Sequence, residues 1–241
     1  RRQAEAVAEY DACLAEYCEC IEFDFAFEER GRLVFAKEMD ALRGTAAAFQ
    51  GWLREQFANN VRYDRFVSEV LLANGNLGTR GPALFYLALE RKPEELASAT
   101  SRIFLGVQIG CAQCHDHPFD HWTRNDFWGL AAFFAGVQPQ EGGRNNAFTL
   151  IETRNAELKI PDSDTIAAPV LLGGVASPDG DGTLTRRMRL ARGLTSADTP
   201  YFARATVNRV WAMLFGRGII DPVDDLGRHN PASHPELLDL L

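Results

Sequence analysis

Two cysteines and a histidine lie within five consecutive residues, Cys111-Ala112-Gln113-Cys114-His115. This Cys-x-x-Cys-His pattern is the attachment motif of c-type haem. Two thiols at this spacing can add to the two vinyl groups of one porphyrin, and the adjacent histidine can ligate the iron. The pattern therefore predicts a covalently bound haem c, attached to Cys111 and Cys114, with His115 as an axial ligand of the iron.

A methionine or a second histidine usually fills the sixth position of such an iron. The candidates are Met188, Met213, His229 and His234, and the sequence does not rank them. Six aromatic residues near the motif would supply flat apolar surface for a porphyrin, although the simpler interpretation is that they form the protein core. They are Phe119, Trp122, Phe127, Trp128, Phe133 and Phe134.

A zinc ion is the main alternative to haem at this motif. Cys111, Cys114, His117 and His121 form a compact Cys₂His₂ set, and thiolates and imidazoles are the ligands that tetrahedral zinc prefers. Only two residues separate the second cysteine from the first of these histidines, so a single site made from all four would be strained. His115 could replace either imidazole.

With either metal, Asp116 and Asp120 could accept hydrogen bonds from imidazole N–H groups. Two further interpretations stay open: a redox-active dithiol, for which the usual strand-helix context is missing, and a reduced structural pair beside surface histidines. The remaining cysteines, Cys13, Cys18 and Cys20, have no histidine nearby and are interpreted as incidental. Five cysteines in two tight groups do not resemble a disulfide framework.

The charge balance argues against a nucleic-acid partner. The chain of 241 residues carries 25 basic and 33 acidic residues, a formal net charge of −8, and it has no long basic run to attract a phosphate backbone. The tightest basic cluster, Arg186, Arg187 and Arg192, is expected on the polar face of a helix. No apolar run approaches the roughly 20 residues of a membrane span.

Apolar spacing predicts a mainly α-helical fold. A clear start signal is Pro93 followed by Glu94 and Glu95, and Gly110 is expected to end that helix. Its expected buried stripe includes Ile103. Helices are predicted over residues 49–61, 63–72, 93–109, 124–134, 184–194 and 200–215, with a weaker stripe within residues 4–14.

The helix expected after the motif has Thr123 and Asp126 spaced as a capping box. Beyond it, Gly, Asn, Pro and Asp become frequent, with β-leaning runs at 148–151 and 169–172. We therefore predict three parts: a helical domain with the motif over residues 1–137, a loop-rich linker over 138–183, and the N-terminal part of a second helical domain over 184–241. The ends of the chain suggest an internal fragment of a longer protein.

The chain resembles a known pair of families. Residues 104–120, Phe-Leu-Gly-Val-Gln-Ile-Gly-Cys-Ala-Gln-Cys-His-Asp-His-Pro-Phe-Asp, are similar to the planctomycete cytochrome-associated domain of unknown function fifteen-forty-nine. Residues 208–211, 214–218, 222–225 and 230–238 resemble its partner domain, fifteen-fifty-three. Such proteins are exported and often carry a cytochrome c domain, so the resemblance implies an extracytoplasmic, haem-associated setting. Residues 11–45 do not resemble the family.

These observations predict haem-linked electron transfer, or a redox accessory role, with a redox partner protein in the periplasm or outside the cell, because c-type haem is attached outside the cytoplasm. They do not predict an enzymatic reaction or an oligomeric state. The alternative is a non-catalytic binding or scaffold module with a structural zinc ion. In that case a ligand surface in the second domain would include Asn208, Arg209, Asp224, Asp225 and His234, unless these residues form a hydrogen-bonded loop.

Overall fold

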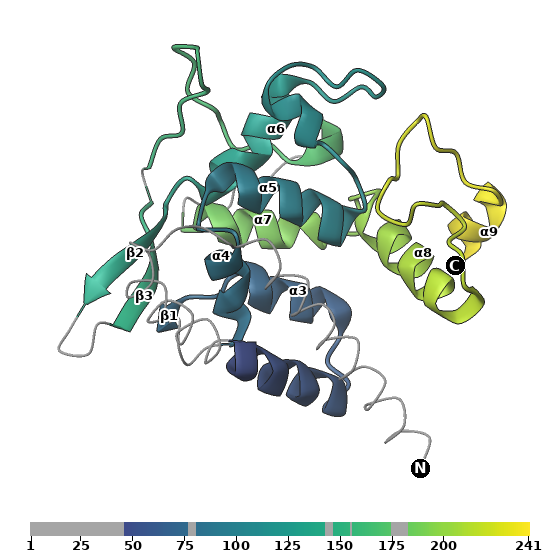
Figure 1. Cartoon of the computed structure of the whole chain (residues 1–241), viewed down its shortest axis with the longest axis horizontal. Helices are drawn as coiled ribbons and strands as arrows, with labels where there is room; N and C mark the ends of the chain where they lie inside the picture. The colour runs from purple at the N-terminus through teal and green to yellow at the C-terminus, as the bar shows by residue number, and fades with distance from the viewer. Residues whose placement is uncertain (1–45, 77–80, 143–146, 155, 175–182) are drawn as a thin grey trace, which may run out of the picture. The chain divides into compact units, whose positions relative to one another are not determined.

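The computed structural model describes residues 46–76, 81–142, 147–154, 156–174 and 183–241, all of them in one compact unit, Leu42–Leu241. The stripe predicted within residues 4–14 and the unusual segment 11–45 lie outside the described residues. The described chain is mainly helical, as predicted, with a small antiparallel sheet (Figure 1). None of its described helices is long and apolar enough to cross a membrane.

Four helical segments precede the cysteine motif and share one apolar core. They are a helix over residues 46–58, α3 (Tyr63–Leu71), α4 (Leu84–Ala88) and α5 (Pro93–Thr100). Trp52 on the first helix stacks on Phe66 of α3, with ring centroids 4.9 Å apart. The other face of α3 buries Val67 and Leu71 completely. The apolar spacing thus predicted the existence of both helices correctly, although the first ends at residue 58 and Phe57 of its expected stripe is exposed.

The helix that leads to the motif starts as predicted but ends earlier. Pro93 lies in the first turn of α5, with Glu94 and Glu95 near the positive end of the helix dipole. After Thr100 the chain widens into a π-helical turn, η2 (Ser101–Leu105). Gly106 ends this turn in the left-handed conformation, with φ +64°, so the prediction that Gly110 ends the helix is wrong.

The π turn also changes which side chains are buried. A π turn contains more residues per turn than an α-helix and therefore rotates the side chains that follow it. Ile103, which α-helical spacing placed in the buried stripe, is 43% exposed, whereas Leu105 is 3% exposed. The sequence did not predict this shift, because its apolar pattern continues without a break.

The helix after the motif has the predicted start. Thr123 accepts a hydrogen bond from the backbone of Asp126, and the Asp126 carboxylate accepts one from the backbone of Thr123, which completes the capping box of α6 (Arg124–Ala131). The 3₁₀ turn η4 (Ala132–Phe134) continues it. Phe127 of α6 and Phe133 and Phe134 of η4 are completely buried and belong to the hydrophobic core.

A three-stranded antiparallel sheet of order β1-β3-β2 joins the start of the predicted linker to a short strand that precedes α4. The strands are β1 (Gly75–Asn76), β2 (Val137–Gly142) and β3 (Ala147–Glu152). The run 148–151 was predicted as a strand and lies within β3, but β2 was missed because its Gln, Pro and Gly disfavour strands. The predicted strand at 169–172 is wrong, since that segment leads into a 3₁₀ turn, η5 (Leu172–Gly174).

Three helices complete the described chain: α7 (Arg186–Leu194), α8 (Phe202–Phe215) and α9 (Pro235–Leu240). Gly216 ends α8 in the left-handed conformation, as expected. The apolar stripe of α8 is buried only near its start, at Phe202 and Ala205. Towards its end, Leu214 and Phe215 are exposed, and the latter borders a groove of about 390 Å³ shared with Leu237 of α9.

The prediction that Arg187 lies on a polar helix face is wrong. Its side chain is 3% exposed and its Nε donates to Glu152 Oε2 on β3 at 3.0 Å. Its Nη1 donates to the carbonyl of Ala73 at 2.6 Å, and its guanidinium lies 5.2 Å from the ring centroid of Tyr86. A single charged side chain therefore ties α7 to the sheet and to the end of α3.

Replacing Arg187 with Ala leaves the nearly buried Glu152 carboxylate without its partner. Removing one member of a buried pair costs about 3–5 kcal/mol, and we expect the free energy of unfolding to fall by about that amount in urea denaturation. The matched control is Arg192→Ala, an exposed arginine on the same helix, for which a change within about 0.5 kcal/mol is expected. Equal losses in both variants would contradict this role of Arg187.

Candidate functional site: the cysteine–histidine turn

The cysteine motif forms a tight exposed turn on a buried base. The 3₁₀ turn η3 (Gly110–Gln113) contains Cys111, and its middle residue, Ala112, is completely buried. The Ala112 N–H donates to the carbonyl of Ile109 at 2.8 Å, which closes the turn. Because Ala112 points inward, the flanking thiols face out: Cys111 and Cys114 are both exposed and both free.

The histidine of the motif is held in one tautomer by its neighbour. His115 Nδ1 lies 2.8 Å from the backbone carbonyl of Asp116. A carbonyl can only accept a hydrogen bond, so the proton resides on Nδ1 and the lone pair on Nε2. Among the described residues Nε2 has no hydrogen-bond partner. This is the arrangement in which protein imidazoles ligate metals, with one ring nitrogen fixed from behind and the other open.

Helix α6 fixes the turn from the other side. The carbonyl of Gln113 accepts hydrogen bonds from Trp128 Nε1 at 3.0 Å and from Arg124 Nε at 3.4 Å. The Arg124 N–H donates to Asp116 Oδ1 at 2.8 Å. The Asp116 carboxylate therefore accepts a hydrogen bond from the first turn of α6 and not from an imidazole. The predicted contact between Asp116 and a histidine is made by the backbone carbonyl of Asp116, with His115.

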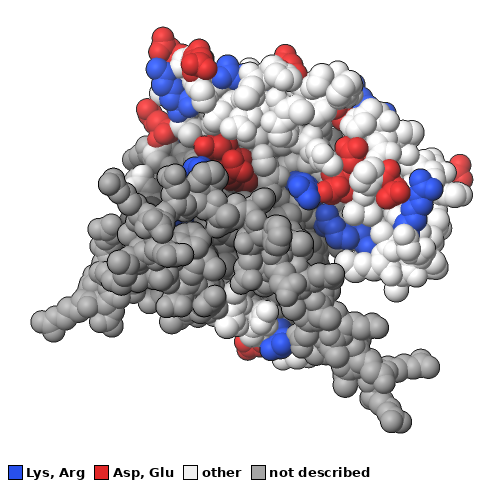
Figure 2. Space-filling view, viewed as in Figure 1, with Lys and Arg blue, Asp and Glu red and all other residues white. Residues whose placement is uncertain are grey.

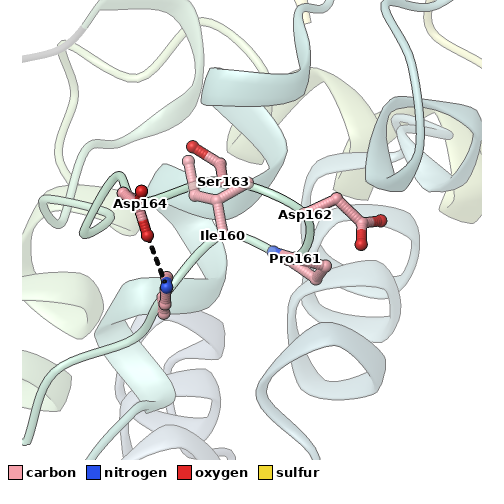
Figure 3. Close-up of a pocket in the computed structure, with 6 residues that line it drawn as sticks. Ile160, Pro161, Asp162, Ser163 and Asp164 are labelled. Carbon is pink, nitrogen blue, oxygen red and sulfur yellow. Dashed lines mark hydrogen bonds and ion pairs between the residues drawn. The ribbon is translucent and has the colours of Figure 1, made fainter.

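Arg124 also reaches a second turn, at residues 159–164. Its Nη2 donates to the carbonyl of Pro161 at 2.5 Å. That turn surrounds a pocket of about 400 Å³ and is closed by an ion pair between Lys159 Nζ and Asp164 Oδ1 at 2.8 Å (Figure 3). The Asp162 carboxylate in this turn is exposed. The pocket thus belongs to a surface turn that braces the motif through Arg124.

The structure does not bring the predicted zinc ligands together. His117 Nδ1 accepts a hydrogen bond from the backbone of Phe119 at 3.3 Å, and His121 Nδ1 lies 2.5 Å from Asp120 Oδ1. In the described part of the chain, no three Cys, His, Asp or Glu side chains are grouped as a metal site. The contact between His121 and Asp120 is the one that the sequence suggested for an imidazole and its supporting carboxylate.

The aromatic residues around the motif form core rather than a slot. Trp122 and Trp128 are 2% and 4% exposed, and only Phe119 points outward, at 76%. Of the candidates for a sixth iron ligand, Met213 is exposed on α8 and His234 Nδ1 lies 3.1 Å from the Ser233 hydroxyl. His229 is engaged by two carboxylates, as described below, and Met188 lies on α7.

Three of the polar residues predicted to line a ligand surface, or else to form a hydrogen-bonded loop, make hydrogen bonds within the chain. Asn208 is completely buried; its Nδ2 donates to the Ile220 carbonyl at 2.8 Å and its Oδ1 accepts from the Ile220 N–H at 2.9 Å. Arg209 Nη1 donates to the carbonyl of Ile103 at 2.6 Å. Asp224 accepts from Arg102 Nε at 2.7 Å. Figure 2 shows acidic and basic side chains close together around α8 and the C-terminal segment.

A cluster that sequence reasoning missed joins the loop after the cysteine motif to the C-terminal segment. Asp120, with a side chain that is 2% exposed, accepts hydrogen bonds from the backbone of His121 at 2.7 Å and of Arg228 at 3.2 Å. Its Oδ2 lies 3.7 Å from His229 Nδ1, and His229 Nε2 lies 3.1 Å from Asp225 Oδ2. The sequence feature that could have indicated this cluster is an aspartate close to a histidine at two places: Asp120 with His121, and Asp225 with His229.

Two pKa shifts report the electrostatics of this cluster. Burial alone raises the pKa of Asp120, but hydrogen bonds from the His121 backbone and ring and from the Arg228 backbone outweigh it and lower the pKa below its ordinary value. Burial raises the pKa of Tyr201, and the negative charge of Asp120 raises it further. The carboxylate is therefore ionised at neutral pH.

The comparisons place this turn and this loop in known families. Residues 30–139 match PSCyt2, a protein of unknown function (DUF1549), and residues 186–241 match PSD1, a protein of unknown function (DUF1553). The two matches confirm the resemblance to this pair of domains. The first match starts at residue 30, which corrects the expectation that the whole of residues 11–45 departs from the family. No curated protein and no solved structure shows a significant match.

Replacing Asp120 with Asn should lower the free energy of unfolding at pH 5 by about 1–3 kcal/mol, because charged hydrogen bonds to a buried carboxylate are lost. The pKa of Asp120 is depressed in the folded chain, so its stabilisation is complete above about pH 4 and is lost as the pH falls through the folded pKa. The difference between the variant and the unmodified chain should therefore narrow from pH 5 to pH 3 in urea denaturation.

The control for this comparison is Asp162→Asn, which removes an exposed carboxylate. It should change the free energy of unfolding by less than about 0.5 kcal/mol at either pH. A gap between Asp120→Asn and the unmodified chain that stayed constant down to pH 3 would show that the Asp120 charge is not the stabilising feature.

Proposed function

We propose that this protein carries a covalently attached haem c and serves in electron transfer, or as a redox accessory, outside the cytoplasm. The observation that carries the proposal is the combination of two free, exposed thiols with a histidine whose Nδ1 proton is bound to a backbone carbonyl. The same turn presents the three atoms that covalent haem attachment requires, which are two sulfurs and one Nε2 lone pair.

The residues present fit this group. Cys111 Sγ and Cys114 Sγ would form the two thioether bonds, and His115 Nε2 would ligate the iron. When bound, haem supplies a one-electron couple between ferric and ferrous iron. The chain contributes by holding the imidazole in one tautomer through the carbonyl of Asp116 and by fixing the turn through Trp128 and Gln113.

The exposure of the motif supports electron transfer to or from a partner protein. Both thiols lie at the surface, while the neighbouring aromatic residues are packed into the core. A group attached there would stay accessible to a redox partner protein, as electron transfer requires. An extracytoplasmic location, periplasmic or secreted, follows from the same chemistry, because the thioether bonds of haem c are made outside the cytoplasm.

The test is expression with export in a host that contains haem-attachment machinery, followed by a pyridine haemochrome spectrum and metal analysis of the same sample. We expect about one haem per chain, with an α-band that survives acid-acetone extraction. The double variant Cys111→Ser/Cys114→Ser should lose this band, because no thioether bond can form. Its matched control is His117→Gln, a neighbouring histidine without a role in attachment, which should keep it.

The same sample decides between haem and the alternatives. A colourless protein with near-stoichiometric zinc that is lost in His121→Gln would support a scaffold with Cys111, Cys114, His117 and His121 as ligands. A protein with neither signal would overturn both metal proposals and leave a structural cysteine pair.

A further inference from the structure

The Asp120 carboxylate lies in a loop, yet both of its oxygens have hydrogen-bond partners in the chain. Asp120 receives its own neighbour's N–H, an N–H from the loop of Arg228 and the ring of His121. The backbone at Gly227 passes so close that an added Cβ would lie 2.6 Å from Asp120 Oδ2. Contacts from two loops, 108 residues apart in the sequence, therefore fix both oxygens of this carboxylate.

The imidazole that this carboxylate holds keeps its other nitrogen open. His121 Nδ1 lies 2.5 Å from Asp120 Oδ1, so it carries the proton and Nε2 carries the lone pair. The side chain is 35% exposed, and Nε2 has no hydrogen-bond partner among the described residues. The ring of Trp122 lies 4.1 Å away between centroids, which fixes the imidazole plane as well.

The other histidines of the chain lack this arrangement. His115 and His234 face a backbone carbonyl and a hydroxyl, which are neutral acceptors. His117 uses its Nδ1 as an acceptor, and His229 has a carboxylate at each ring nitrogen. Of the five histidines in the sequence, all of them described, His121 alone combines a buried anionic acceptor on Nδ1 with an open Nε2.

We propose that His121 is a general base and that Asp120 is its positioning residue, in a hydrolytic site that acts on small uncharged carboxylic esters. Imidazole with a carboxylate on Nδ1 is the base of many acyl hydrolases, because the carboxylate selects the tautomer and stabilises the imidazolium that forms. The two carboxylates of the cluster, Asp120 and Asp225, disfavour an anionic ester.

The step balances with water as the only co-reactant. His121 Nε2 takes a proton from a water molecule as the water oxygen bonds to the ester carbonyl carbon. The carbon–oxygen bond to the alcohol then breaks, and the proton passes from Nε2 to the departing alkoxide. Acid and alcohol leave, and the imidazole returns to its starting state. Neither thiol takes part, so this activity is independent of haem attachment.

The test uses the full chain with p-nitrophenyl acetate, and the quantity measured is the steady-state rate after any stoichiometric burst. Exposed thiols such as Cys111 and Cys114 would give a burst of acylation, whereas a general base continues to turn over. We expect His121→Gln to lower the steady-state rate at least about tenfold, since general-base catalysis contributes about 10²-fold or more. The matched control, His234→Gln, removes an exposed histidine with a neutral acceptor and should change the rate less than about twofold.

The positioning role of Asp120 has its own readout. Asp120→Asn should lower kcat at least about tenfold with little change in KM, and ¹⁵N-detected spectra of the unmodified chain should show His121 in the Nδ1–H tautomer. If Asp120→Asn does not fold, His121→Gln at the more exposed position still decides the question. Equal steady-state rates in His121→Gln and His234→Gln, or an Nε2–H tautomer at His121, would overturn the proposal. The haemochrome spectrum of His121→Gln separates this outcome from a failure of haem attachment.

Discussion

The π turn at residues 101–105 is the constraint on which the position of the cysteine motif depends. A helix end leaves its last carbonyls without partners, and a widened turn adds to their number. Here the partners come from far along the chain: Arg209 donates to the carbonyls of Arg102 and Ile103, and the Leu226 N–H donates to the Gly106 carbonyl at 2.7 Å. The motif begins five residues after Gly106, so its place is set by these bonds.

The donors are themselves held by a buried amide. Asn208 bonds to both backbone groups of Ile220 and so fixes the loop that carries Asp224 and Leu226. Gly106 allows that loop to approach, since a Cβ there would lie 2.9 Å from Leu226 Cδ1. The segment that matches PSD1 therefore completes the end of a helix in the segment that matches PSCyt2. This gives a physical reason for the two families to occur in one chain.

Local signals in the sequence predicted local structure well. The capping box of Thr123 and Asp126, the start of α5 at Pro93 and the end of α8 at Gly216 are all confirmed, because each depends on residues within one helical turn. The failures depend on distant partners. Arg187 is buried because Glu152 lies on a strand 35 residues away, and no periodicity within α7 reveals that strand.

The candidate site divides in the same way. The sequence indicated Cys111 to His115 as the candidate site, and the structure places both cysteines in an exposed turn with His115 Nδ1 beside the Asp116 carbonyl. It did not predict that Asp120 would contact the loop of Arg228 and His229, because apolar spacing carries no information on which polar loops meet. The π turn was missed for a related reason: two of its carbonyls, those of Arg102 and Ile103, accept hydrogen bonds from Arg209 of another segment.

The loop from 111 to 121 contains three imidazoles, and those of His115 and His121 have Nδ1 beside different kinds of acceptor. His115 donates to a neutral carbonyl, whereas His121 faces an ionised carboxylate that cannot move. An anionic acceptor raises the basicity of the opposite nitrogen and stabilises the protonated ring more than a carbonyl does. The two rings thus differ in the charge of the group that faces Nδ1, which is neutral at His115 and negative at His121. Because Asp120 is fixed by the loop of Arg228, this difference is maintained by the second segment as well as by the motif itself.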